Sequence, residues 1–436
     1  MMKRCTCGPH PRIDLTAAYL EYHKISSSGG GEASSRQEKD DDDELKSCRE
    51  KIRQACRSHG CFHTSIDFTS LISSTLPIES LAKPMAKVEN EIESLFLDAP
   101  DFNGGSVKVH MKQSSSLATS QVTEEVTFRG RTAESGDEHQ SVPEPKLSWE
   151  YCRCLSARMS KSNENRDVPV AVENDEYDRL QNWTKALHSV ATVVIHSMGF
   201  SQQIAINEKS CNCMYKVAEK CNIDLLRCFR YDAIPDEERD QFLGSSSHTD
   251  WGSLTVVWQD DKGGLQTFCS ACDKWSDVDA TVGQTPDDNN ENTTTNKRIN
   301  LFVHVGDFLS LATHGEGMEH LPIWPSPRHR VICPTQRPGQ NESSNCRRSL
   351  VYFAYPPPNI SLATVQKVIE PLIFNDSRES TIMFHDYSLL HDQSQQDGAT
   401  AQNGAIVSTH FETYEKMRRR PFGEVIAEKW DQVQRK

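Results

Sequence analysis

The chain has 436 residues, and 48 lysine and arginine residues against 62 aspartate and glutamate residues give it a formal net charge of −14 at pH 7. This acidic balance argues against a nucleic-acid-binding surface, which usually needs a basic patch. No stretch approaches the roughly 20 apolar residues that a membrane-spanning helix requires, and the N-terminus has no apolar segment typical of a secretory signal. We therefore expect a cytoplasmic protein that binds neither nucleic acid nor a membrane.

Residues 1–168 are expected to form an N-terminal region of helices and strands with two disordered insertions. The predicted elements, in chain order, are a strand at 11–15, a helix at 44–59, a β-prone run at 61–66 and a helix at 78–97. Residues 26–44 are rich in Ser and Gly and then acidic, and residues 103–168 are polar throughout. Such composition favours disorder, because too little apolar surface is available for burial.

Residues 169–222 are expected to give helical support. A helix is predicted over 176–198, because its apolar side chains recur at three- and four-residue steps. These side chains are Leu180, Trp183, Leu187, Val190 and Val194. Gly199 is the predicted stop.

Strands are predicted to dominate residues 223–355, which we take as the catalytic core, with a polar surface insertion at 283–296. The prolines at 356–358 end this block, since proline cannot continue a β-ladder. Residues 356–436 are expected to be a C-terminal segment with a helix at about 408–429, broken at Pro421. The 15 cysteines are expected to be free thiols.

His248 and Asp250 form the first part of a predicted metal site. They are two residues apart and precede a run of β-branched and aromatic residues at 251–258. Residues two apart in a strand point to the same face. The sequence therefore predicts that both side chains lie at the start of one strand and converge on one ion.

The third ligand must come from elsewhere in the chain, and we predict His329, which opens another β-prone run. Two imidazoles and one carboxylate are the donors of the facial triad that holds non-haem Fe(II) and leaves coordination positions open. Three other histidines compete for this role. His304 lies in a predicted strand and is expected to be a core residue, whereas His314 and His320 lie in a loop-like stretch and are expected at the surface.

Arg347 and Ser349 begin a predicted strand at 347–354 and would share one of its faces. The planar guanidinium can bind a carboxylate through two parallel hydrogen bonds, and the serine hydroxyl adds a donor. An arginine on an apolar strand needs an anionic partner, because burying an unpaired charge is very costly. We therefore predict that both residues bind a carboxylate-bearing co-substrate, with an ordinary structural ion pair as the alternative.

The order of these motifs resembles the isopenicillin N synthase-like family of Fe(II)/2-oxoglutarate-dependent dioxygenases. Residues similar to its HTD-G-LT-L-QD--GGLQV, VNIGD, HRV and R-S--FF motifs are, in turn, 248–268, 303–307, 329–331 and 347–353. Residues 226–231 resemble its LR---Y strand, but Phe229 stands where many plant members have Asn. The resemblance extends in pieces from about residue 11 to about residue 420.

The resemblance implies a mainly β fold, a distorted double-stranded β-helix (a cupin-like jelly roll) with helices packed outside. The residues that would bind Fe(II) are His248, Asp250 and His329. Those that would hold 2-oxoglutarate are Arg347, Ser349 and Tyr231. With O2, and with ascorbate as a helpful reductant, such enzymes convert 2-oxoglutarate to succinate and CO2 while they hydroxylate, desaturate or cyclise a small organic molecule.

Two other functions stay open. An oxidase of the same fold would draw all electrons from its own substrate, and Arg347 with Ser349 would then hold a substrate carboxylate. A binding protein could keep the fold without catalysis, although the presence of all three ligands argues against this. Neither the substrate nor the oligomeric state follows from the sequence.

Overall fold

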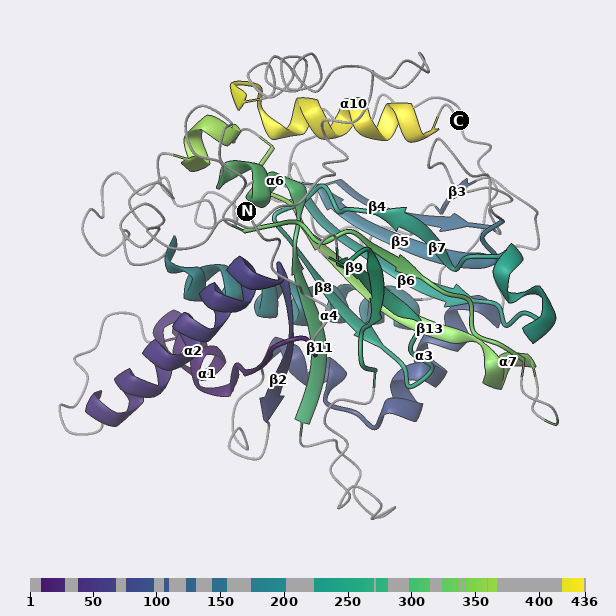
Figure 1. Cartoon of the computed structure of the whole chain (residues 1–436), viewed down its shortest axis with the longest axis horizontal. Helices are drawn as coiled ribbons and strands as arrows, with labels where there is room; N and C mark the ends of the chain where they lie inside the picture. The colour runs from purple at the N-terminus through teal and green to yellow at the C-terminus, as the bar shows by residue number, and fades with distance from the viewer. Residues whose placement is uncertain are drawn as a thin grey trace.

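Two largely antiparallel sheets and a set of surrounding helices make up a mixed α/β structure (Figure 1). The structure is a computed structural model. It describes residues 9–27, 38–67, 76–97, 106–109, 123–130, 143–154, 174–200, 223–269, 272–280, 298–313, 324–336, 339, 342–358, 360–366 and 418–434.

The larger sheet has nine strands and draws on both halves of the chain. In spatial order they are β1 (Arg12–Asp14), β2 (Cys61–Asp67), β11 (Arg298–Val305), β8 (Leu254–Gln259), β13 (Arg347–Ala354), β6 (Ile223–Tyr231), β5 (Lys146–Cys154), β4 (Thr123–Arg129) and β3 (Ser106–Val109). Neighbouring strands are antiparallel except for β1 and β2, which are parallel.

The smaller sheet has four antiparallel strands and packs on the larger one. Its strands, in spatial order, are β10 (Lys274–Asp277), β9 (Leu265–Cys269), β12 (His329–Val331) and β7 (Ser245–His248). A buried apolar cluster contains side chains from both sheets: Cys61, Phe229, Tyr231, Val257, Leu265, Val278, Phe302 and Val331. The face of the larger sheet that carries this cluster is therefore an interior surface between two β layers.

Helices pack around the sheets. They are α1 (Thr16–Ser27), α2 (Glu38–Ser58), η1 (Pro77–Leu81), α3 (Met85–Leu97), α4 (Asn174–Ile195) with its π-helical continuation η2 (His196–Phe200), η3 (Asp236–Gln241), α6 (Asp307–Ala312), α7 (Glu342–Asn345) and α10 (Phe422–Gln434). The apolar stripe predicted for the helix at 176–198 is confirmed, because all five of its residues are at most 1% exposed in α4. Helix α4 lies against the other face of the larger sheet, where His188 Nδ1 donates to Tyr352 Oη at 2.8 Å.

The predicted disorder of 103–168 is wrong for the residues that form β4 and β5. Phe128, Trp149 and Tyr151 are at most 5% exposed, and the aromatic side chains of β5 alternate with polar ones. The polar residues of these strands hid the alternation, because they are paired with each other across the sheet rather than solvated. The flexible segment predicted at 26–44 is likewise too long, since α2 begins at Glu38.

Two predicted helices have different bounds in the structure. The helix predicted at 78–97 is divided into η1 and α3, and Pro84 lies between them. Helix α10 begins at Phe422, directly after the predicted break at Pro421, whereas residues 408–417 lie outside the described residues, as do 283–296, His314 and His320. Among the described helices, none combines the length and apolar character needed to cross a bilayer.

Candidate metal centre

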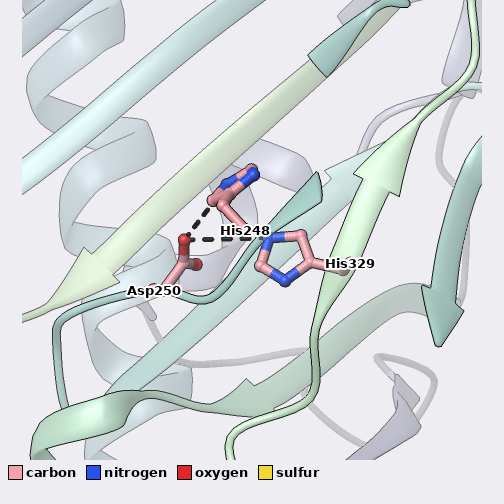
Figure 2. Close-up of side chains that lie close together, drawn as sticks. All are labelled: His248, Asp250 and His329. Atoms are coloured by element: carbon pink, nitrogen blue, oxygen red, sulfur yellow. Dashed lines mark ion pairs between the residues drawn. The ribbon is translucent and has the colours of Figure 1, made fainter. Parts of the chain in front are cut away.

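The three predicted metal ligands lie together (Figure 2). Asp250 Oδ1 is 3.5 Å from His248 Nε2 and 3.7 Å from His329 Nε2. One potential ligand atom from each residue lies within 4.8 Å of the other two. The side chains of Asp250 and His329 are 5% and 8% exposed, but that of His248 is 41% exposed. The cluster is therefore closed by protein on one side and accessible beside His248.

The two histidines converge because β7 and β12 are neighbours in the smaller sheet. His248 ends β7, His329 begins β12, and the two residues are directly paired. Asp250 is in the turn between β7 and β8, not in a strand. The expectation that His248 and Asp250 share one strand is therefore corrected: a cross-strand pair and a turn bring the ligands together.

Helix α6 holds this turn in place. Asp307 N donates to Asp250 O at 2.6 Å, and Thr249 Oγ1 donates to Asp307 Oδ2 at 2.9 Å. The backbones approach closely at Gly306, where an added Cβ would lie 2.2 Å from Gly252 O and 3.1 Å from Asp250 O. A side chain at Gly306 would therefore push on the turn that carries Asp250.

We expect Gly306→Ala to weaken metal binding through this displacement. Forcing extra volume into packed structure costs about 1–3 kcal/mol, so both the free energy of unfolding and the Fe(II) affinity should fall. Anaerobic Fe(II) titration and thermal unfolding measure the two effects. Gly339→Ala is the control: its φ is +82°, which costs stability, but the added Cβ meets no atom within 4 Å. Unchanged Fe(II) affinity in Gly306→Ala would contradict the role given to this contact.

Backbone carbonyls fix the orientation of both imidazoles. His248 Nδ1 lies 2.7 Å from Ser246 O, and His329 Nδ1 lies 3.1 Å from Pro327 O. A carbonyl can only accept, so each Nδ1 carries the proton and donates it. Each Nε2 then presents a lone pair toward Asp250, which is the arrangement that metal-binding histidines need.

The electrostatics of the cluster favour a neutral His329 and an ionised Asp250, the protonation states in which these two residues bind a cation. Burial lowers the pKa of His329 to about 3, and the neighbouring His248 adds to this effect, so His329 is neutral. Burial alone would raise the pKa of Asp250, but the imidazole of His329 and its neighbours outweigh it and hold that pKa well below the usual range. Burial would also lower the pKa of His248, but its interaction with Asp250 raises it overall.

The second oxygen of Asp250 faces away from the two ligand histidines. Asp250 Oδ2 accepts a hydrogen bond from Thr255 Oγ1 and lies 3.4 Å from His304 Nε2. His304 is 2% exposed, and burial lowers its pKa, so its ring is neutral. His304 is a core histidine, as predicted, and its Nε2 is directed at Oδ2, which leaves Oδ1 for a metal.

Sequence reasoning missed Thr255 and the contact of His304. The two residues are paired across β8 and β11, so only the strand register shows that they meet at one carboxylate.

We expect His304→Leu to lower Fe(II) affinity by about ten- to a hundredfold, the usual cost of losing a group that orients a metal ligand. His304→Gln, which retains an N–H donor, should lose less. Thr255→Val, which removes the other contact to Oδ2 at similar volume, should resemble His304→Leu. Fe(II) titration without O2 measures all three variants, and wild-type affinity in both His304→Leu and Thr255→Val would contradict this role.

Arg347 forms a second polar centre in the interior. It is 1% exposed and donates to Gly263 O at 2.5 Å, Gln259 Oε1 at 2.9 Å and Ser349 Oγ at 3.2 Å. Its Cζ is 4.7 Å from the centre of the Tyr231 ring. Across the part of the chain that the structure describes, this guanidinium has no ion-pair partner. Its hydrogen bonds go to neutral acceptors, and an aromatic ring lies beside it. The carboxylate of Asp260, whose pKa burial raises to about 6 despite Arg347, acts on this guanidinium electrostatically.

Strand register brings the predicted 2-oxoglutarate residues together. On β13 and β6, Arg347 is paired with Tyr231 and Ser349 with Phe229. The rings of Phe229 and Tyr231 stack, with centres 5.5 Å apart and planes at 28°. Phe229 therefore adds an apolar surface beside the arginine, where an asparagine would have placed an amide.

Both centres lie in a segment that matches a known family. Residues 222–356 match the family profile of the 2OG-Fe(II) oxygenase superfamily. Residues 222–356 are therefore a segment of the 2OG-Fe(II) oxygenase superfamily. The matched segment contains His304 and all the predicted site residues: Tyr231, His248, Asp250, His329, Arg347 and Ser349.

Two plant proteins are similar to this chain over part of its length. It is 28% identical to "1-aminocyclopropane-1-carboxylate oxidase homolog 7" of Arabidopsis thaliana over 183 residues, which cover 41% of each chain. It is 32% identical to homolog 11 of the same plant over 200 residues, which cover 44% of this chain and 43% of the relative. The match thus spans about two fifths of these relatives.

Among solved structures, one of a full-length Neurospora crassa protein in complex with alpha-KG is similar to this chain. The alignment covers 83% of this chain and 91% of the Neurospora crassa chain at 16% identity, with a TM-score of 0.48.

Fe(II) and 2-oxoglutarate are the cofactors that the superfamily implies, and the residues present fit both. Two imidazole nitrogens and one carboxylate oxygen suit Fe(II) better than a thiolate set would. The buried Arg347, whose acceptors among the described residues are neutral, suits the carboxylate end of 2-oxoglutarate.

Proposed function

We propose that the protein is an Fe(II)- and 2-oxoglutarate-dependent oxygenase that hydroxylates or desaturates a small organic molecule and releases succinate and CO2. The observation that carries this proposal is the pairing of two centres in one matched segment. His248, Asp250 and His329 offer three convergent donors, and Arg347 offers a buried cation whose hydrogen bonds, among the described residues, go to neutral acceptors.

Each residue has a role in this proposal. His248 and His329 hold Fe(II) through Nε2, and Asp250 holds it through Oδ1. Arg347 and Ser349 bind the carboxylate of 2-oxoglutarate, and the ring of Tyr231 borders it. When bound, the iron and 2-oxoglutarate supply the oxidising chemistry with O2. The apolar cluster between the sheets limits the access of water to it.

We propose further that the two facing sheets are a distorted double-stranded β-helix and that residues 223–355 are its catalytic core. The support is the pair of antiparallel sheets around a common apolar cluster, together with the superfamily match at 222–356. Strands β1 to β5 would then extend this core, and α4 would support its outer face.

Coupled product release tests the proposal. Purified protein with Fe(II), ascorbate, O2 and 2-oxoglutarate should form succinate and CO2 in equal amounts, slowly without substrate and faster with it. Iron binding without any succinate, under every condition tried, would contradict the use of 2-oxoglutarate. Failure to bind iron would favour a non-catalytic binding protein.

An oxidase without a 2-oxoglutarate requirement is the second candidate. It is favoured by the two plant relatives, which are named as 1-aminocyclopropane-1-carboxylate oxidase homologs. Such an enzyme would consume O2 in the absence of 2-oxoglutarate, so O2 uptake with and without this acid separates the two.

A further inference from the structure

Strands β4 and β5 bring charged residues to the interior face of the larger sheet. Both strands lie outside the matched segment 222–356. Glu150 of β5 is paired with Arg227 of β6 on one side and with Thr127 of β4 on the other. Arg129 is two residues from Thr127 and lies on the same face. Three charged side chains thus meet on one surface.

This surface continues to the metal centre. Thr255, which donates to Asp250 Oδ2, is paired with Phe353 of β13. The guanidinium Cζ of Arg227 is 5.7 Å from the centre of the Phe353 ring. Burial lowers the pKa of Arg227, but Glu150 and, to a smaller extent, Asp250 raise it overall. Arg227 is therefore on the strand next to Phe353, within electrostatic reach of a proposed iron ligand.

Among the side chains that the structure describes around Glu150, positive charge is in excess. Arg227 Nη2 and Nε donate to Glu150 Oε2 at 2.6 Å and 2.7 Å, and Arg129 Nη2 lies 3.4 Å from the same oxygen. Burial would raise the pKa of Glu150, but the two guanidinium groups outweigh it and lower that pKa to about 2. Glu150 is therefore ionised, and two cations share one anion.

Not every N–H donor of the two arginines is paired with a described group. Arg129 Nε is buried, and no group among the described residues accepts a hydrogen bond from it. The side chains of Arg129 and Arg227 are 28% and 30% exposed, so a ligand can reach them. A partly buried cation with unused N–H groups is stabilised by an anion that accepts from it. One arginine would have sufficed for an internal ion pair with Glu150.

We propose that Arg129 and Arg227 bind an anionic group of the substrate, so that the substrate is an organic acid held by its carboxylate beside the metal centre. This inference rests on the proposed function and specifies its substrate class. Phe353 lies between the arginines and the metal centre and would contact the carbon skeleton of the acid. The substrate carboxylate would be distinct from that of 2-oxoglutarate, which Arg347 holds.

Matched acids and amides test this assignment. The probes are phenylacetate, cinnamate and octanoate, each against its primary amide. They are titrated without O2 into the full-length protein loaded with Fe(II) and 2-oxoglutarate, and binding is read from the visible charge-transfer absorption of the iron complex. At least one acid should bind about tenfold more tightly than its amide, the scale of one charge-assisted hydrogen bond.

Three variants separate recognition from structure. Arg227→Gln and Arg129→Gln should each lose about tenfold in affinity for the acid and little for the amide. Glu150→Gln removes the internal competitor and should bind the acid more tightly, a gain that a purely structural role would not give. Arg153→Gln is the matched control, because Arg153 is also on β5 but on the opposite face.

The outcomes distinguish this inference from the proposed function. If no charge-transfer absorption forms with Fe(II) and 2-oxoglutarate, the proposed function fails first. If it forms, but no acid binds or every amide binds as well as its acid, the substrate assignment is overturned. It is also overturned if both Arg227→Gln and Arg129→Gln, with wild-type iron and 2-oxoglutarate binding, keep the preference for the acid.

Discussion

Asp250→Ala should lose Fe(II) binding and succinate formation together. Asp250 supplies the only carboxylate among the three convergent donors, and its Oδ1 lies between His248 Nε2 and His329 Nε2. Loss of a group that merely orients a metal ligand already weakens binding by about ten- to a hundredfold. Removal of the ligand itself should therefore weaken Fe(II) binding by more than about a hundredfold. Anaerobic titration and a succinate assay measure both effects.

The control for Asp250→Ala is Asp236→Ala, which removes an exposed carboxylate in η3. It should bind iron and form succinate as the wild type does. Asp250→Asn keeps the shape of the side chain but removes its charge. It therefore shows whether Fe(II) binding is lost because the charge is removed or because the packing is altered. An Asp250→Ala protein that turns over 2-oxoglutarate without bound iron would refute the assignment of the triad.

The candidate metal ligands could be proposed from the sequence because their chemistry is local. A His-x-Asp pair and a later His-Arg-Val can be recognised from residue types alone. The structure brings the side chains of His248, Asp250 and His329 together. The two-residue period of a strand does not by itself explain how these side chains converge, however. Asp250 lies in a turn that Asp307 and Gly306 hold from α6. A backbone contact between segments more than 50 residues apart leaves no periodic signal in either segment.

The fold was predictable where burial has a regular period. The apolar stripe of α4 repeats at three- and four-residue steps, and its residues are buried as expected. Strands β4 and β5 could not be predicted because charged residues such as Glu150 and Arg129 stand next to their aromatic side chains and resemble those of a solvated loop. These residues neutralise one another only after β5 pairs with β4 and β6. Charge compensation across strands cannot be read from one strand alone.

The metal centre is oriented by contacts that do not involve a metal. Backbone carbonyls fix the Nδ1 atoms of His248 and His329, and Thr255 with His304 occupies the second oxygen of Asp250. Each ligand therefore has one atom held by protein and one directed at the common centre. Such positioning lowers the entropy lost when a cation binds, and it favours a single oxygen of Asp250 as the ligand.

Arg347→Gln should retain Fe(II) and lose 2-oxoglutarate. Glutamine can still donate hydrogen bonds, but it lacks the charge and the planar fork that match a carboxylate. Hydrogen bonds to charged groups contribute about 1.5–3 kcal/mol each, so 2-oxoglutarate affinity should fall by at least about tenfold and by more than a hundredfold if two bonds are lost. Charge-transfer absorption without O2 reports 2-oxoglutarate binding, and metal titration reports iron binding separately.

Two further variants sharpen this prediction. Arg347→Lys keeps the charge without the fork and should fall between the wild type and Arg347→Gln. Arg12→Gln removes an exposed surface ion pair with Asp279 and should change neither affinity, since such pairs contribute little. Wild-type 2-oxoglutarate affinity in Arg347→Gln would mean that the buried guanidinium serves the sheet rather than the co-substrate. The oxidase would then be the better account, because an enzyme that draws its electrons from its own substrate does not need this carboxylate site.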